Sequence, residues 1–155
     1  MPRPHLTRQA AGLDVAALTD HESFLGKRIG PGEWAYLQAV TEQYDEPGRF
    51  TAFIGYEWTS LEKGGNLHRN VIFRGDASVA NQTIPFSQFD SQNPEDLWKW
   101  LDTTSASTGA HFIAIPHNSN ISQGLMFPLQ DSEGNVISKE YAATRLKWEP
   151  KPMYL

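Results

Sequence analysis

The stretch Phe50–Arg74, FTAFIGYEWTSLEKGGNLHRNVIFR, decides the fold of this chain. Its first seven residues are apolar and rich in β-branched and aromatic side chains, which is typical of a buried strand, and the run ends on Glu57. A glycine-rich turn and a second β-type run introduced by His68 follow. We therefore predict adjacent antiparallel strands at about Thr51–Tyr56 and His68–Arg74, which would bring Glu57 and His68 together at one sheet edge.

Two further apolar runs end close to a histidine. Leu13–Leu18 is followed by Thr-Asp-His21, and Phe112–Ile115 is followed by Pro-His117. If both runs are parallel strands, the two histidines lie just past the carboxyl ends, where α/β proteins place their active sites. Three imidazoles and a carboxylate would then share one rim, and this donor set suits zinc, manganese or iron.

The rest of the chain supplies helices and loops. Residues 1–12 are polar and lack periodicity, so we interpret them as a loose lead-in to one α/β domain with a mixed sheet over residues 13–155. Asn93 is a good N-cap before a proline and two acidic residues. We predict helices at 31–44, from 94 to about 102 and at 138–148, loops at 22–31, 75–92 and 121–137, and a polar linker at 103–109.

Composition excludes several classes of function. The 155 residues suit one domain, carry a net charge of −5 and include no cysteine, so disulfides and thiolate metal sites are excluded. The charges are dispersed without a basic patch, which argues against a nucleic-acid scaffold as partner. No apolar run approaches the roughly 20 residues of a membrane helix. The first residues show no secretory signal, and the compartment of a longer parent protein stays open between periplasm and cytoplasm.

Four blocks of sequence span most of the chain. They are LDVAALTDH at 13–21, FIGYEWTS at 53–60, NLHRNVIF at 66–73 and AIPHNSN at 114–120. In these blocks, and in their order, the chain resembles the polymerase-and-histidinol-phosphatase (PHP) superfamily of metal-dependent hydrolases, and within it the DUF3604 family.

The resemblance implies a distorted (β/α)7 barrel that holds two or three metal ions and hydrolyses phosphoesters. It implies His21, Glu57, His68 and His117 as metal ligands. The superfamily's opening Asp-x-His-x-His strand is missing, since His5 does not match it, and no late Asp-x-His pair follows. We therefore expect a partial PHP-like barrel, a fragment of a longer hydrolase, which binds at most one transition-metal ion and is inactive alone.

Glu57 has a simpler interpretation, because a carboxylate after an apolar run is costly to bury without a partner. An ion pair with Arg69 or Lys63 would satisfy it. The aromatic neighbours Tyr56 and Trp58 favour the metal interpretation, since they flank Glu57 with apolar bulk rather than charge.

Each of the other polar residues in the blocks has two possible roles. We assign Asp20 and Arg69 to the catalytic machinery, where Asp20 would orient an imidazole and Arg69 would bind a substrate phosphate. Equally, Asp20 could cap a loop and Arg69 could form a salt bridge. Asn118 and Asn120 would contact the substrate or form an Asx-type turn. His111 begins its strand at the opposite edge, so we expect a structural role for it.

The expected activity of the intact parent is metal-assisted hydrolysis of a small phosphoester. One alternative is a hydrolase of another ester or an amide on the same scaffold. The other is a truncated remnant without enzymatic activity.

Overall fold

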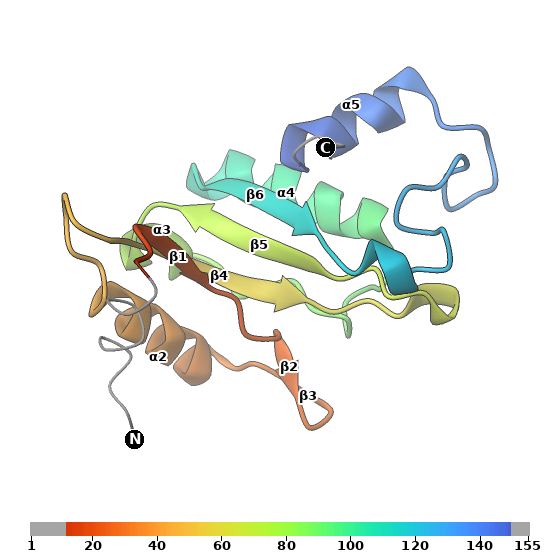
Figure 1. The fold of residues 1–155 in the computed structure, drawn as a ribbon. Coiled ribbons are helices and arrows are strands. Elements are labelled where there is room, and N and C mark those ends of the chain that lie inside the picture. The colour runs from red at the N-terminus through yellow and green to blue at the C-terminus, as the bar shows by residue number, and fades with distance from the viewer. Residues whose placement is uncertain (1–11, 150–155) are drawn as a thin grey trace.

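The computed structural model describes residues 12–149 and shows a mixed α/β fold around an open four-stranded sheet (Figure 1). The strand order is β1-β4-β5-β6, and two short strands, β2 and β3, form a separate hairpin. Within the described part the sheet does not close into a barrel. The strands are β1 (Val15–Leu18), β2 (Ser23–Phe24), β3 (Lys27–Arg28), β4 (Thr51–Trp58), β5 (Arg69–Arg74) and β6 (His111–Pro116).

Strand directions bring four chain segments to one edge of the sheet. β1 is parallel to β4, while β5 is antiparallel to both β4 and β6. The carboxyl ends of β1, β4 and β6 therefore meet the start of β5 at this edge. The predicted antiparallel pair is confirmed, with Glu57 opposite Asn70, and the connection contains the 3-10 turn η1 (Glu62–Gly64).

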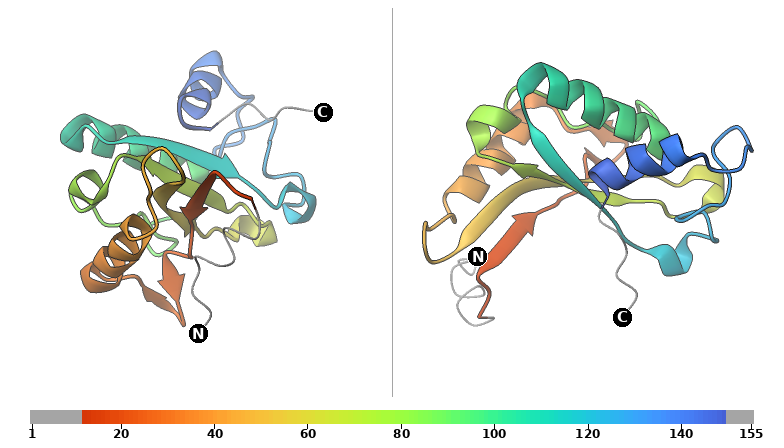
Figure 2. Two further views of the ribbon diagram at one scale, coloured as in Figure 1. Left: turned by 60° about the vertical axis from the view of Figure 1, so that its left-hand side comes forward. Right: turned by 90° about the horizontal axis from the view of Figure 1, so that it is seen from above.

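The helices cover one face of the sheet. α2 (Pro31–Glu42), α4 (Pro94–Thr108) and α5 (Lys139–Trp148) all contribute to the hydrophobic core, and Figure 2 shows α2 and α4 on the same side of the sheet. Alternate residues of β4 point toward this core, and Glu57 points to the other face because side chains alternate along a strand. The core residues include Trp34, Ile54, Tyr56, Trp58, Val71, Phe73, Leu97, Trp98, Leu101 and Trp148.

The predicted linker at 103–109 is wrong, because α4 continues through it to Thr108. Threonine hydroxyls bond back to the helix instead of breaking it: Thr103 Oγ1 donates to Lys99 O at 3.1 Å and Thr108 Oγ1 donates to Thr104 O at 2.7 Å. Gly109 ends the helix with a left-handed φ of 72°. The N-terminal end was predicted correctly, since Asn93 accepts a hydrogen bond from Glu95 N at 3.0 Å.

Smaller differences fall in the predicted loops. Residues 22–31 contain the β2-β3 hairpin, and residues 75–92 contain the short helix α3 (Ala77–Ala80). The first helix ends two residues before its predicted end at 44, while the last helix begins after Ser138 as its N-cap. Of the predicted lead-in, residues 1–11 and His5 with them lie outside the described residues. No helix between residues 12 and 149 is long and apolar enough to cross a membrane.

Candidate metal centre

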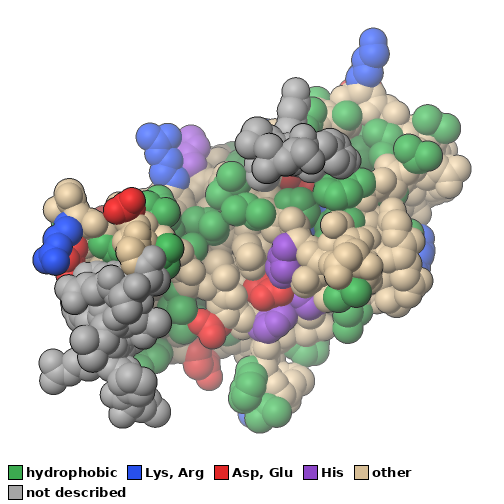
Figure 3. Space-filling view, viewed as in Figure 1, with side chains coloured by type: hydrophobic (Ala, Val, Ile, Leu, Met, Phe, Trp, Pro, Cys, Tyr) green, Lys and Arg blue, Asp and Glu red, His purple; other side chains and the backbone are tan. Residues whose placement is uncertain are grey.

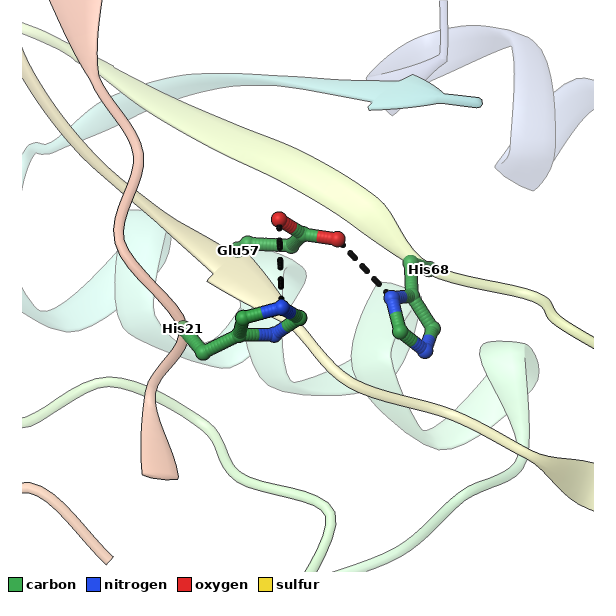
Figure 4. A group of neighbouring side chains, drawn as sticks. All are labelled: His21, Glu57 and His68. Carbon is green, nitrogen blue, oxygen red and sulfur yellow. Dashed lines mark hydrogen bonds and ion pairs between the residues drawn. The ribbon is translucent and has the colours of Figure 1, made fainter. Parts of the chain in front are cut away.

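Glu57 lies at the centre of the cluster that forms at this sheet edge (Figure 4). Its Oε1 is 2.8 Å from His68 Nδ1 and 2.9 Å from His117 Nε2, and its Oε2 is 3.6 Å from His21 Nε2. The three imidazoles come from three different segments of the chain. Over residues 12–149, no lysine or arginine forms an ion pair with Glu57.

Backbone hydrogen bonds hold these segments in place. His21 forms a parallel bridge with Glu57, in which Glu57 N donates to Asp20 O at 2.8 Å and Glu22 N donates to Glu57 O at 3.1 Å. His117 N donates to His68 O at 3.4 Å, which extends the β5-β6 ladder past the end of β6. The positions of the imidazoles therefore follow from the sheet itself rather than from flexible loops.

The cluster is buried on one side and open on the other. The side chains of His68 and Glu57 are 10% and 17% exposed, whereas those of His117 and His21 are 29% and 49% exposed. The His68 ring packs edge-on against His21 and His117, with centroids 5.4 and 6.0 Å apart. Figure 3 shows histidine and acidic side chains gathered on the sheet face that the helices leave uncovered, so solvent can reach the cluster.

Burial lowers the pKa of His68, although the hydrogen bond and charge of Glu57 act in the opposite direction. This shift favours the neutral form of the imidazole, which is the form that binds metals. Nε2 of His68 and Nδ1 of His117 are buried and lack a hydrogen-bond partner among the described residues. In each ring it is the other nitrogen, His68 Nδ1 or His117 Nε2, that contacts Glu57.

Three donor atoms lie close together at this site. One ligand atom each from His21, Glu57 and His68 can be chosen so that all lie within 4.8 Å of one another. Ligands that share a zinc ion at about 2.0–2.2 Å each lie about 3–4 Å apart. His117 is outside this set of three, although its Nε2 contacts the same carboxylate oxygen of Glu57 as His68 Nδ1. Neutral imidazoles with one carboxylate are borderline donors that suit zinc, manganese and iron.

The structure does not bring every predicted site residue to the cluster. Asp20 is exposed and contacts Glu57 through its backbone oxygen. Arg69 points into the opposite face of the sheet, where its Nε donates to Glu149 Oε1 at 2.9 Å. Asn118 and Asn120 belong to the 3-10 turn η2 (Ser119–Ile121) and its N-cap, in which Asn118 has a left-handed φ of 63°.

That turn differs from the Asx type expected from the sequence, since Asn118 makes no side-chain capping hydrogen bond. His111 begins β6 opposite Arg74, at the other end of that strand from His117. It is exposed, as expected for a histidine outside the site.

Two residues that the sequence reasoning missed lie directly behind His21. Thr59 Oγ1 is 2.9 Å from His21 Nδ1, and the same hydroxyl donates to Glu22 Oε2 at 2.9 Å. Glu22 is completely buried. A signal was available, because Glu22 directly follows the Thr-Asp-His block and Thr59 lies two residues after Glu57, so both flank a predicted ligand.

A comparison with protein families adds one finding. The chain matches the family described as "Protein of unknown function (DUF3604)" over residues 5–153. The chain belongs to the DUF3604 family. A search of curated proteins and a search of solved structures found no significant match to this DUF3604 member.

Proposed function

We propose that His21, Glu57, His68 and His117 hold one divalent transition-metal ion, zinc, manganese or iron, at the active site of a metal-dependent hydrolase. The observation that carries this proposal is the set of partners around Glu57. Its carboxylate is mostly buried and contacts three imidazoles, none of which carries a permanent positive charge. A divalent cation supplies the missing charge and uses the neutral imidazoles as ligands.

The other buried carboxylates of the protein show what ordinary compensation looks like here. Glu149 is paired with two arginines, Arg69 and Arg145. Glu22 accepts hydrogen bonds from two backbone amides and two hydroxyls. Within the described part of the chain, the partners of Glu57 are imidazoles, with His68 Nδ1 at 2.8 Å and His117 Nε2 at 2.9 Å from its Oε1. A neutral imidazole can donate a hydrogen bond but brings no charge, which distinguishes this environment from that of Glu149.

A bound ion would supply Lewis-acid chemistry, polarising the scissile bond and lowering the pKa of a bound water. The protein's own residues supply position and access. His68 and Glu57 form the buried side of the site, while the half-exposed His21 forms the side that solvent reaches. Among residues 12–149, no α-helix lies over this face of the sheet (Figure 1), which leaves room for a substrate.

The proposed substrate is a phosphoester, and this choice rests on the resemblance to the PHP superfamily and its barrel of metal-dependent hydrolases. The structure adds one restriction. Arg69, the side chain expected to bind the phosphate, is occupied by Glu149 on the opposite face of the sheet. A carboxylic ester or amide therefore belongs in the same test as the phosphoester.

The test has two stages. The first stage measures the metal content of the purified protein and its affinity for added zinc, manganese and iron. The same measurements are made on Glu57→Gln and on Glu133→Gln, a control at an exposed glutamate. We expect at most one ion per chain. Of the two variants, only Glu57→Gln should lose affinity, by at least about 100-fold, because it removes a side chain that would contact the ion rather than a hydrogen-bond partner of such a side chain. If the purified protein contains no metal and binds none that is added, the non-enzymatic remnant is the better interpretation.

The second stage measures metal-dependent hydrolysis of p-nitrophenyl phosphate, bis-p-nitrophenyl phosphate and p-nitrophenyl acetate. Two-metal phosphoester hydrolysis uses a pair of ions to stabilise the attacking and leaving oxygens, and the ligands identified suffice for one. We therefore expect negligible turnover of both aryl phosphates by these residues alone. Robust metal-dependent turnover would refute the single-ion expectation, and turnover of the acetate alone would favour the carboxylic-ester class.

A further inference from the structure

Glu22 and Thr59 form a hydrogen-bonded relay behind His21. The relay begins at the Glu22 carboxylate, which is completely buried and lies next to His21 in the chain. It passes through the Thr59 hydroxyl, at 2.9 Å from Glu22 Oε2, and ends on His21 Nδ1, also at 2.9 Å. Because the opposite ring atom, Nε2, faces Glu57, the relay contacts the side of the ring that points away from the candidate metal site.

The direction of the first hydrogen bond is set by the other donors to Glu22. Oε2 also accepts from Thr59 N at 3.2 Å, and Oε1 accepts from Gln88 N at 2.8 Å and Ser87 Oγ at 3.3 Å. Backbone amides can only donate, so each carboxylate oxygen already acts as an acceptor. Ser87 Oγ in turn accepts from Phe89 N at 3.3 Å, which leaves its proton for Glu22. Glu22 is therefore the acceptor of the Thr59 hydroxyl proton.

This direction determines what Thr59 can offer to His21. A threonine hydroxyl has one proton and two lone pairs. Since its proton goes to Glu22, the hydroxyl can only accept a hydrogen bond from the imidazole. Nδ1 of His21 must then carry the ring proton, and in the neutral ring Nε2 has a free lone pair.

We propose that Glu22 and Thr59 are positioning residues that lock His21 in its Nδ1–H tautomer and thereby present the Nε2 lone pair to the metal. The proposal rests on the proposed function for the identity of the ion, but the tautomer itself is a property of the metal-free protein. Nε2 is 3.6 Å from Glu57 Oε2, so two lone-pair-bearing atoms face each other with space for a shared cation.

The relay also explains why a half-exposed ring can be a well-ordered ligand. The His21 side chain is 49% exposed, so packing constrains its ring only in part, on the side where it meets His68. Hydrogen bonds to the outer nitrogen of a ligating histidine fix its orientation and raise its basicity. Here the fixed point is itself anchored, because Glu22 connects the segment after β1 to β4 and to the loop at Ser87 and Gln88.

The first experiment is long-range proton–nitrogen correlation NMR of the imidazoles in the metal-free chain. It is recorded at about pH 8, above the ordinary histidine pKa of about 6.5. His21→Gln identifies the signals of His21 by their loss. Free neutral histidine in water carries its proton mainly on Nε2, so the expected Nδ1–H pattern at His21 is informative. An Nε2–H pattern in the unaltered protein would overturn the proposal without any variant.

Thr59→Val removes the hydroxyl at nearly constant shape, and Thr59→Ser restores it. We expect the His21 signals to shift toward the Nε2–H pattern in the valine variant and to return to Nδ1–H in the serine variant. Thr103→Val, an exposed threonine on α4, is the matched control for the valine substitution and should leave the pattern unchanged. An unchanged Nδ1–H pattern in a folded Thr59→Val protein would refute the relay.

The second readout is zinc affinity measured by competition with a chelating dye. Loss of an outer hydrogen-bond partner of a metal-binding histidine typically weakens binding about 10–100-fold, and we expect this loss for Thr59→Val with recovery in Thr59→Ser. Equal zinc affinities of Thr59→Val and Thr59→Ser would overturn the role of the relay in metal binding. If the unaltered chain binds no zinc, the proposed metal site fails, and the tautomer measurement still decides whether the relay exists.

Discussion

Arg69 and Glu149 form an ion pair that is almost completely buried, with 2.9 Å between Nε and Oε1 and side-chain exposures of 1% and 2%. Trp98 Nε1 donates to the same oxygen at 2.9 Å, and Arg145 Nε donates to Oε2 at 2.8 Å. The pair joins β5 to the residue that ends α5, on the opposite face of the sheet from Glu57. Arg69 is therefore part of the framework that holds the sheet and its helices together.

This pair predicts a large loss of stability in Glu149→Gln, because the substitution leaves the Arg69 guanidinium buried without its counter-charge. Removing one partner of a buried pair costs about 3–5 kcal/mol. Urea denaturation monitored by tryptophan fluorescence measures the free energy of unfolding. The control is Arg49→Ala, which breaks an exposed pair with Glu46 and should change stability by less than about 1 kcal/mol. Similar small effects of both substitutions would show that the buried pair is dispensable.

Two histidines at opposite ends of β6 allow a matched test of the metal site. His117 is 2.9 Å from Glu57, whereas His111 is exposed and pairs with Arg74 in the strand ladder. We expect His117→Ala to weaken zinc binding by at least about tenfold. Removing only a hydrogen-bond partner of a metal-binding histidine weakens binding about 10–100-fold, so removing the histidine itself should cost at least as much. His111→Ala should leave it unchanged. Isothermal titration calorimetry of both variants measures the difference, and equal affinities would remove His117 from the proposed ligand set.

Gly55 predicts a link between strand packing and the site. A Cβ at this position would lie 2.9 Å from Val71 O and 3.2 Å from both Leu18 O and Thr19 Cγ2, all closer than ordinary contact. Gly55→Ala should therefore push β4 away from its neighbours and destabilise the protein by about 1–3 kcal/mol. Zinc affinity should fall as well, since the spacing of β1 and β4 sets the separation of His21, which follows β1, and Glu57, which lies in β4.

The control for this substitution is Gly32→Ala in the first turn of α2. A Cβ there meets no atom within 4 Å, and alanine is the better helix former by about 1 kcal/mol. The control should be as stable as the unaltered protein or more stable, with the same zinc affinity. A Gly55→Ala protein that matches it in thermal denaturation would contradict the close packing at β4.

Tyr141 predicts a change of stability at alkaline pH. Burial, followed by the charge of Glu95, raises the pKa of its phenol to about 12, from 10.0 in the absence of these effects. The folded state therefore favours the neutral phenol. This contribution to stability is complete below about pH 10 and is lost as the pH rises toward 12.

Absorbance titration of phenolate formation should show a tyrosine with a midpoint at about 12 that is missing in Tyr141→Phe. Over the same interval, the free energy of unfolding should fall more steeply in the unaltered protein than in the variant, because only the former gains a phenolate on unfolding. Identical pH profiles of stability would show that Tyr141 ionises equally well in both states.

Much of the site could be predicted from local sequence because each predicted ligand is next to a strand-end signal. His21 and His117 follow short apolar runs, and Glu57 and His68 flank a glycine-marked connection. Strand direction then places such residues at one edge, which the sheet order and pairing reproduce. Local patterns predicted structure less well where a residue type occurs in both helices and linkers. Thr103 and Thr108 were predicted to lie in a linker, but their hydroxyls form hydrogen bonds within α4.

The sequence by itself thus determined the strand ends, the N-cap of α4 and the residues brought to one edge, because periodicity and turn chemistry are properties of neighbouring residues. Only the tertiary structure decided the partners of the buried charges. Glu22 finds Thr59 at a separation of 37 residues and Arg69 finds Glu149 at a separation of 80. A buried charge is stable only where other segments deliver donors or counter-charges to it, and the packing of the whole sheet determines which segments those are.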